Sequence, residues 1–187
     1  VETTESGRYL LIVSHDHTTS EVRWLPADQP DAEPRVIAPR QRDVEYSVSD
    51  HDDQWLILTN AGGAEDFAIC QTPIDSHSPA SIQDWQVLIA ERPGRLIEGM
   101  QVFARWLVRQ ELEDAESRLV VRDLSAGTET IIDQPDPCVE VGIIPGLEYD
   151  TDSLRFGLSG LTLPAQLFDY DMASGERTRS KTQSTPT

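Results

Sequence analysis

The stretch Gly157-Leu-Ser-Gly-Leu161 comes closest to a catalytic motif in this sequence. Serine hydrolases of the α/β class present their nucleophile in a G-x-S-x-G turn between a strand and a helix. Leu161 replaces the last glycine of that motif, and the surrounding sequence alternates like a strand, a turn and a second strand. The stretch therefore predicts a β-hairpin, and we expect no catalytic residue in this chain.

Two groups of residues carry the side chains of a metal site. His15 and His17 would place two imidazoles on one face of an extended strand, but no third or fourth ligand is signalled nearby. The acidic segment 50–53 lacks the spacing of glycine and glutamate in a calcium-binding EF-hand loop. Both groups are expected to be polar turns, and Cys70 to be a buried structural thiol. We expect no metal and no cofactor.

A recurring glutamate is the more specific candidate for a binding role. Glu45, Glu98 and Glu140 each follow an aliphatic residue at the opening of a predicted strand. If these strands line the central channel of a β-propeller, the three carboxylates form part of an acidic ring or arc that favours cationic ligands. The alternative is that each glutamate pairs with an arginine such as Arg42 or Arg95, or faces bulk water.

Short strands must position all of these residues, and Arg105 to Asp133 shows their pattern most clearly. Apolar and polar residues alternate there with a period of two, and β-branched residues are frequent. Trp106 and Arg109 are predicted on opposite faces of the first strand. The polar stretch 111–117 is expected to be a hairpin tip, and Gly127 to supply the positive φ of the next turn.

The same unit recurs along the chain. Positions that begin its first strand are 46, 51 and 48 residues apart by subtraction of residue numbers: Tyr9, Trp55, Trp106 and Leu154. Positions in the returning strand are 45, 52 and 48 apart: Val22, Phe67, Leu119 and Leu167. Four antiparallel strands every 40–50 residues are typical of a β-propeller blade, whereas a β-sandwich has no such recurrence.

The predicted fold is therefore all-β, a β-propeller of about four four-stranded antiparallel blades. The expected blades are 1–48, 49–103, 104–144 and 145–187. The fourth strands of the first three blades, each carrying one of the recurring glutamates, are expected at Val44–Val48, Arg95–Phe103 and Cys138–Ile144.

Composition limits the partners and the location of the chain. A formal net charge of −18 over 187 residues argues against nucleic acid, and no apolar run is long enough to span a membrane. Two distant cysteines, Cys70 and Cys138, and the absence of a signal-peptide pattern favour a reducing, cytoplasmic location. Both ends look like cuts in a longer protein. Exposed blade faces would then allow the fragment to form a homo-oligomer.

Several short segments, none decisive alone, follow one another along nearly the whole chain: Thr18–Val22, Asp31–Pro34, Asp43–Ser47, Ile97–Gly99, Arg105–Val108, Leu154–Gly157, Pro164, Leu167–Phe168 and Asp171–Arg177. In this order they resemble the prolyl oligopeptidase family, within it the oligopeptidase B (protease II) group. The resemblance implies a seven-bladed propeller, of which this chain would be roughly blades four to seven. It also implies a catalytic α/β-hydrolase domain, absent from this chain, that holds a Ser-Asp-His triad.

The same resemblance implies a function. The parent would be a serine protease that cleaves short peptides after Arg or Lys, and the propeller would limit access to its catalytic domain. The chain would be inactive by itself, and its partners would be its own catalytic domain and short basic peptides. The alternative is a free-standing propeller that serves as an interaction scaffold, because the fold alone does not choose between functions. A G-x-S-x-G elbow encoded downstream of Thr187 would favour the peptidase.

Overall fold

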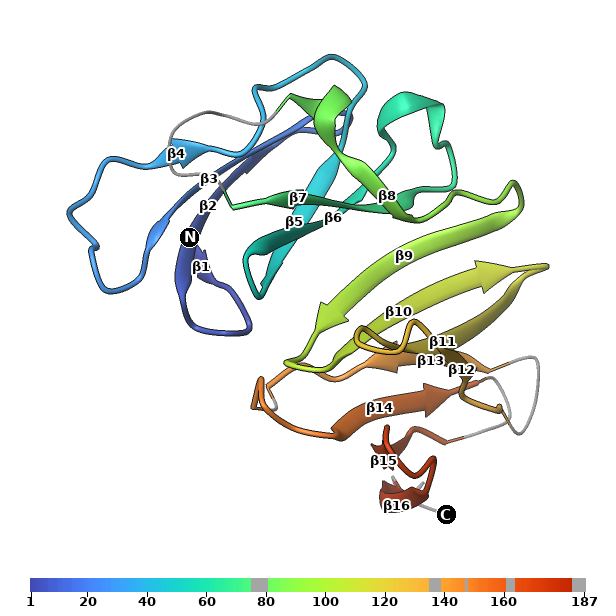
Figure 1. The fold of residues 1–187 in the computed structure, drawn as a ribbon. Coiled ribbons are helices and arrows are strands. Elements are labelled where there is room, and N and C mark those ends of the chain that lie inside the picture. The colour runs from blue at the N-terminus through green and yellow to red at the C-terminus, as the bar shows by residue number, and fades with distance from the viewer. Residues whose placement is uncertain (75–80, 135–138, 147, 161–163, 183–187) are drawn as a thin grey trace. The chain divides into compact units, whose positions relative to one another are not determined.

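Strands make up nearly all of the regular structure of this chain. The computed structural model describes residues 1–187 except 75–80, 135–138, 147, 161–163 and 183–187. In the described residues, sixteen strands form four antiparallel sheets of four strands each (Figure 1), which confirms the predicted all-β fold with four blade-like sheets. Contacts divide the chain into two compact units, Val1–Pro93 and Gly94–Thr187. Within the described part, no helix has the length and apolar character needed to cross a membrane.

The first unit holds two sheets. The first sheet consists of β1 (Glu2–Thr3), β2 (Tyr9–His15), β3 (Ser20–Pro26) and β4 (Arg35–Val36). The second consists of β5 (Tyr46–His51), β6 (Gln54–Thr59), β7 (Ala68–Pro73) and β8 (Gln86–Ile89), with 3-10 turns η1 (Ala61–Gly63) and η2 (Ile82–Asp84) in its loops. The rings of Tyr9, Trp24 and Trp55 lie 5.1–5.5 Å apart between their centroids and form the centre of the core that joins these sheets.

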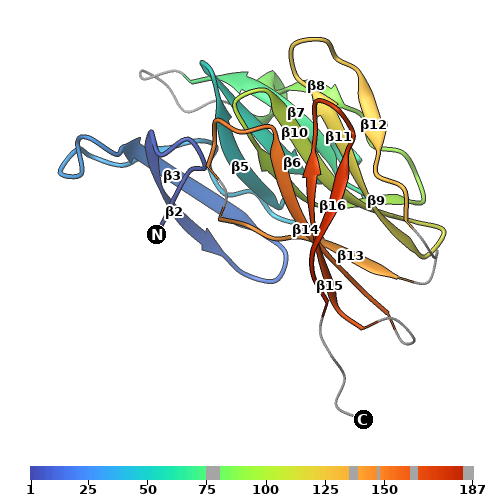
Figure 2. The same ribbon diagram turned by 90° about the horizontal axis from the view of Figure 1, so that it is seen from below.

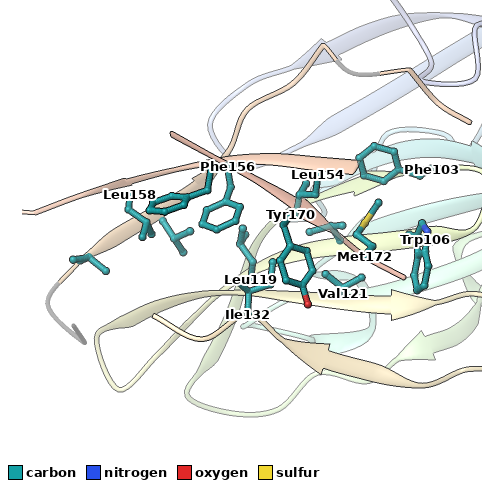
Figure 3. Packing of buried hydrophobic residues seen from close by; sticks show 14 residues of the cluster. Phe103, Trp106, Leu119, Val121, Ile132, Leu154, Phe156, Leu158, Tyr170 and Met172 are labelled. Atoms are coloured by element: carbon teal, nitrogen blue, oxygen red, sulfur yellow. The ribbon is translucent and has the colours of Figure 1, made fainter. Parts of the chain in front are cut away.

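The second unit repeats this plan. Its sheets consist of β9 (Arg95–Val102), β10 (Trp106–Glu113), β11 (Glu116–Asp123) and β12 (Glu129–Ile131), and of β13 (Glu140–Ile143), β14 (Ser153–Ser159), β15 (Gln166–Asp171) and β16 (Arg177–Thr182) (Figure 2). One core cluster joins them, and Figure 3 shows its side chains pointing into the space between the strands. Trp106, Leu119 and Val121 contribute from the third sheet, and Leu154 and Phe156 from the fourth. As predicted, Arg109 lies on the opposite face from Trp106, because the side chains of a strand alternate.

The assignment of strands to sheets corrects the predicted blades. The segments expected as fourth strands are the first strands of the following sheets, because β5, β9 and β13 pair with β6, β10 and β14. The sheets therefore span 2–36, 46–89, 95–131 and 140–182 rather than 1–48, 49–103, 104–144 and 145–187. Alternation shows which faces a strand has, but not which neighbour accepts its backbone hydrogen bonds. Cys138, expected to open one of these strands, lies outside the described residues.

Of two predicted turns in the third sheet, one is shorter than expected and the other agrees with the prediction. The tip expected over 111–117 is shorter, because β10 and β11 remain paired as far as Glu113 and Glu116. Only Asp114 and Ala115 form the turn, with φ values of 53° and 63°. Two successive positive φ values are typical of the type I′ turn that suits the twist of a hairpin. Gly127 has φ 71°, as predicted.

Candidate functional site

The three recurring glutamates occupy one structural position. Glu140 is the first residue of β13 and pairs with Ser159, five residues after Leu154. Glu45 directly precedes β5 and is hydrogen-bonded through its backbone to Asn60, five residues after Trp55. Each therefore lies on the terminal first strand of its sheet, or directly before it, and opposite the end of the second strand. The sequence predicted that these glutamates share a strand type, and the pairing shows that Glu45 and Glu140 also share a register.

Glu98 holds the equivalent place in the third sheet, with a local distortion. Gly99 pairs with Gln110 and Ile97 pairs with Glu111, so Glu98 is the extra residue of a β-bulge. Glu98 lies opposite Gln110 and Glu111, which follow Trp106 by four and five residues, close to the equivalent place in the other two sheets. The side chain of Glu98 is exposed, and its Oε2 accepts a 2.9 Å hydrogen bond from Nε2 of Gln110. A bulge changes the direction of the side chains on its strand, and Gln110 on the partner strand is within hydrogen-bonding distance of the Glu98 carboxylate.

The arginines considered as partners of these glutamates pair elsewhere. Arg42 Nε lies 3.4 Å from an oxygen of Asp43, and Arg95 Nε lies 3.6 Å from Oε1 of Glu111. Glu140 is exposed, like Glu98, and Glu45 is half-buried. The exposure of Glu98 and Glu140 fits both the channel position and the alternative of contact with bulk water.

A network of buried charges underlies the sheet that carries Glu98. Glu111 is fully buried, and its two oxygens accept hydrogen bonds from Nε of Arg109 at 2.6 Å and Nε of Arg118 at 2.8 Å. Arg109 also donates to both oxygens of Glu129, at 2.9 and 2.8 Å, so it links β10 to β12. Paired donors and acceptors of this kind offset the cost of burying charge. The network therefore holds the third sheet together and is a structural feature.

The network also sets the protonation of its carboxylates. Burial raises the pKa of Glu111, but the hydrogen bonds and charges of Arg109 and Arg118 outweigh it, so the net shift of this pKa is downward. The pKa of Glu129 is lowered mainly by its hydrogen bonds from Arg109, against the opposing effect of burial. Both carboxylates are therefore ionised at neutral pH.

One of the candidate metal ligands, Asp50, has other partners. Asp50 was expected in a polar turn, but it lies in β5, fully buried, and accepts hydrogen bonds from Ser6 Oγ at 2.8 and 2.7 Å and from Arg8 Nε at 2.8 Å. His15 and His17 are exposed. Among the residues that the structure describes, no three side chains of histidine, cysteine or acid type gather as a metal site would require.

The two remaining candidates for chemistry agree with the sequence interpretation. Ser159 is the last residue of β14, in an antiparallel hairpin with β15, and Leu161 lies outside the described residues. Cys70 is buried in β7, and burial raises the pKa of its thiol. A buried, protonated thiol is a poor nucleophile.

Three residues that touch the glutamate positions were not anticipated. Gln110 holds the Glu98 carboxylate, whereas Ser20 and Ser117 bond the backbone next to Glu45 and Glu140. The serines had a visible signal, since each precedes by two residues one of the recurring positions Val22 and Leu119. Gln110 had none, because its role depends on the bulge.

Comparison with known proteins agrees with this architecture. The family model described as "Prolyl oligopeptidase, N-terminal beta-propeller domain" matches residues 1–183. The chain is 33% identical over 180 residues to the dipeptidyl aminopeptidase BI of Pseudoxanthomonas mexicana. This alignment covers 96% of the chain and 24% of that protein. It is 25% identical over 179 residues to protease 2 of Moraxella lacunata, with 95% and 24% coverage. The chain thus spans about a quarter of the length of these relatives.

Solved structures show the same fold. Oligopeptidase B from Leishmania major superposes with a TM-score of 0.87 at 24% identity, and oligopeptidase B from Trypanosoma brucei with 0.87 at 25% identity. Each alignment covers 98% of this chain and 27% of the larger protein. With the family model matched over nearly all of its residues, the chain belongs to the prolyl oligopeptidase family, in the N-terminal β-propeller domain.

Proposed function

We propose that this chain is the substrate-access, or gating, segment of a cytoplasmic serine oligopeptidase that hydrolyses short peptides after arginine or lysine. It would act with the catalytic α/β-hydrolase domain of the same protein. The names of the relatives support peptide hydrolysis, since they include protease 2 and oligopeptidase B. The single observation that carries the access role is the recurrence of glutamate at one register position in three successive sheets: Glu45, Glu98 and Glu140.

Electrostatics explains how such positions would act. The chain has a formal net charge of −18, so a basic peptide is attracted before it makes any contact. Carboxylates at the same place on successive first strands would add to that attraction. Salt weakens the effect, because the screening length falls to about 8 Å at physiological ionic strength.

The test is charge reversal in the complete polypeptide that contains residues 1–187. We expect Glu45→Lys, Glu98→Lys and Glu140→Lys together to lower kcat/KM for a basic oligopeptide by about tenfold at low salt, within the range known for electrostatic steering. The loss should shrink at high salt, and a neutral peptide used as competitor should bind unchanged. The matched control reverses three exposed glutamates in loops away from the first strands: Glu33, Glu65 and Glu176.

Two outcomes would contradict the proposal. If both triple variants lose the same activity, net charge rather than position is responsible. The complete polypeptide should hydrolyse a fluorogenic basic dipeptide, and a serine-directed reagent should inhibit this turnover. If no such turnover is found, the peptidase assignment fails and the interaction scaffold takes its place.

We also propose that residues 1–187, expressed alone, associate through their exposed blade faces. Unpaired sheet faces and edges favour such association. Light scattering over a range of concentrations tests this, and a monomeric mass at the highest concentration would contradict it.

A further inference from the structure

A serine of the first sheet bonds the opening of the second sheet. Ser20, the first residue of β3, is 93% buried. Its Oγ accepts a 3.1 Å hydrogen bond from the backbone nitrogen of Tyr46, and its own backbone nitrogen donates to the carbonyl of Val44 at 3.1 Å. Ser20 therefore bonds the chain on both sides of Glu45.

The second unit contains the same arrangement. Ser117, in β11 of the third sheet, accepts a 3.4 Å hydrogen bond at Oγ from the backbone nitrogen of Val141 and donates a 3.3 Å bond to the carbonyl of the same residue. Val141 directly follows Glu140 in β13. Thus two units with different sequences place a serine from the preceding sheet against the residue after the glutamate.

The position of these strands explains why a side chain is needed. Both β5 and β13 are terminal strands, so the outward-facing groups of their backbones have no strand beside them in their own sheet. Tyr46 is 4% exposed and Val141 is fully buried, so water does not readily replace the missing partner. A buried N–H needs a hydrogen-bond partner, and the serine hydroxyl supplies it.

The same contact determines where the glutamate points. Successive side chains of a strand project to opposite faces, so holding Tyr46 or Val141 in the core sends the neighbouring glutamate the other way. The side chain of Tyr46 is held further, because its hydroxyl donates to the carbonyl of Ala38 at 2.7 Å. At Glu98 the bond from Gln110 acts on the carboxylate itself.

We infer that Ser20 and Ser117 are positioning residues, which fix from the preceding sheet the backbone that presents Glu45 and Glu140 to a cationic peptide. This inference rests on the proposed access role for its effect on peptides, whereas the bonding of the two backbones stands apart from it. The two parts have separate tests.

The first test measures amide hydrogen exchange of the complete polypeptide by mass spectrometry with fragmentation. In the Ser20→Ala and Ser117→Ala variants, we expect exchange at Tyr46 and Val141 to become about tenfold faster, as loss of one buried hydrogen bond would produce. Ser→Thr at each position keeps the hydroxyl and should retain most of the protection. Ser47→Ala and Ser159→Ala, at exposed serines of the same sheets, are the controls and should change neither amide.

The second test measures kcat/KM for basic and neutral peptides with the Ser20→Ala/Ser117→Ala protein. We expect a loss of about threefold to tenfold for the basic peptide at low salt, with little change for the neutral peptide. Equal losses for both peptides would show a merely structural role and overturn the inference. Unchanged exchange at Tyr46 and Val141 would also overturn it.

The proposed function and this inference fail differently. If the glutamate reversals slow basic peptides but the serine variants do not, only the positioning role is wrong. If the glutamate reversals have no effect while the exchange rates rise, the access role is wrong and the serines are structural ties between sheets.

Discussion

The indole nitrogen of Trp106 donates a 2.7 Å hydrogen bond to Oδ1 of Asp152, and so joins the third sheet to the loop between β13 and β14 of the fourth sheet. A second bond runs beside it, from the backbone nitrogen of Ala104 to the carbonyl of Tyr149. The guanidinium of Arg105 covers the Trp106 ring at 4.4 Å from its centroid. Polar contacts thus supplement the apolar core between these two sheets.

Removing the acceptor should weaken this junction. We expect Asp152→Ala to lower the free energy of unfolding by about 1 kcal/mol, because Trp106 is 5% exposed and its N–H loses its partner. Asp152→Asn keeps an acceptor oxygen and should cost less. Urea unfolding followed by tryptophan fluorescence measures the shift, with Asp150→Ala as the control for loss of charge in the same exposed loop. A control variant as unstable as Asp152→Ala would contradict the assigned bond.

The buried network predicts a larger effect at Glu111. Glu111→Ala would leave the guanidinium of Arg109, which is 3% exposed, without one of its two carboxylates, and we expect a loss of about 3 kcal/mol. Glu113→Ala should cost much less, because Glu113 and its partner Arg118 are both partly exposed. The double variant Arg109→Met/Glu111→Leu should recover part of the loss, because it removes both charges. No recovery in the double variant would show that local packing, rather than unpaired charge, determines the result.

The same carboxylates make stability depend on acid. The pKa of Glu111 and that of Glu129 are lower in the folded chain than the usual value of about 4.3. The unfolded chain therefore binds more protons as the pH falls through that value, and the stabilisation present at neutral pH is lost toward the folded-state pKa. We expect the free energy of unfolding to fall with pH below about 5, and to fall less steeply in Glu111→Gln. Equal slopes in the two proteins would contradict this.

The hairpin tip of the third sheet allows a stabilising substitution. Ala115 has φ 63°, a conformation that costs an L-residue about 1 kcal/mol and glycine almost nothing. We expect Ala115→Gly to raise the free energy of unfolding by about 0.5 kcal/mol, after the extra entropy of glycine in the unfolded chain is subtracted. Ala173→Gly, at an exposed turn position without positive φ, is the control and should destabilise. Destabilisation by both glycines would contradict the turn assignment.

The glutamate positions show how much of the candidate site could be predicted from the spacing of residues in the sequence. The repeat of about 48 residues placed Glu45, Glu98 and Glu140 in equivalent strands, and the hydrogen-bond register agrees. The repeat gave no sign of the bulge at Glu98, because a bulge depends on the partner strand and inserts only one residue. Whether the three carboxylates act on a peptide is a matter for the charge-reversal experiment.

The sequence of neighbouring residues determined where the strands lie, because the alternation of apolar and polar residues reflects the two faces of each strand. The recurrence of aromatic and aliphatic positions from Tyr9 to Leu154 determined the blade-like repeat. Only the tertiary structure decided that β5, β9 and β13 open their sheets, since alternation distinguishes the two faces of a strand but does not show which neighbouring strand it pairs with. The tertiary structure also decided that Glu111 is buried, because its partner Arg118 lies on the neighbouring strand and offsets the cost of burying the carboxylate.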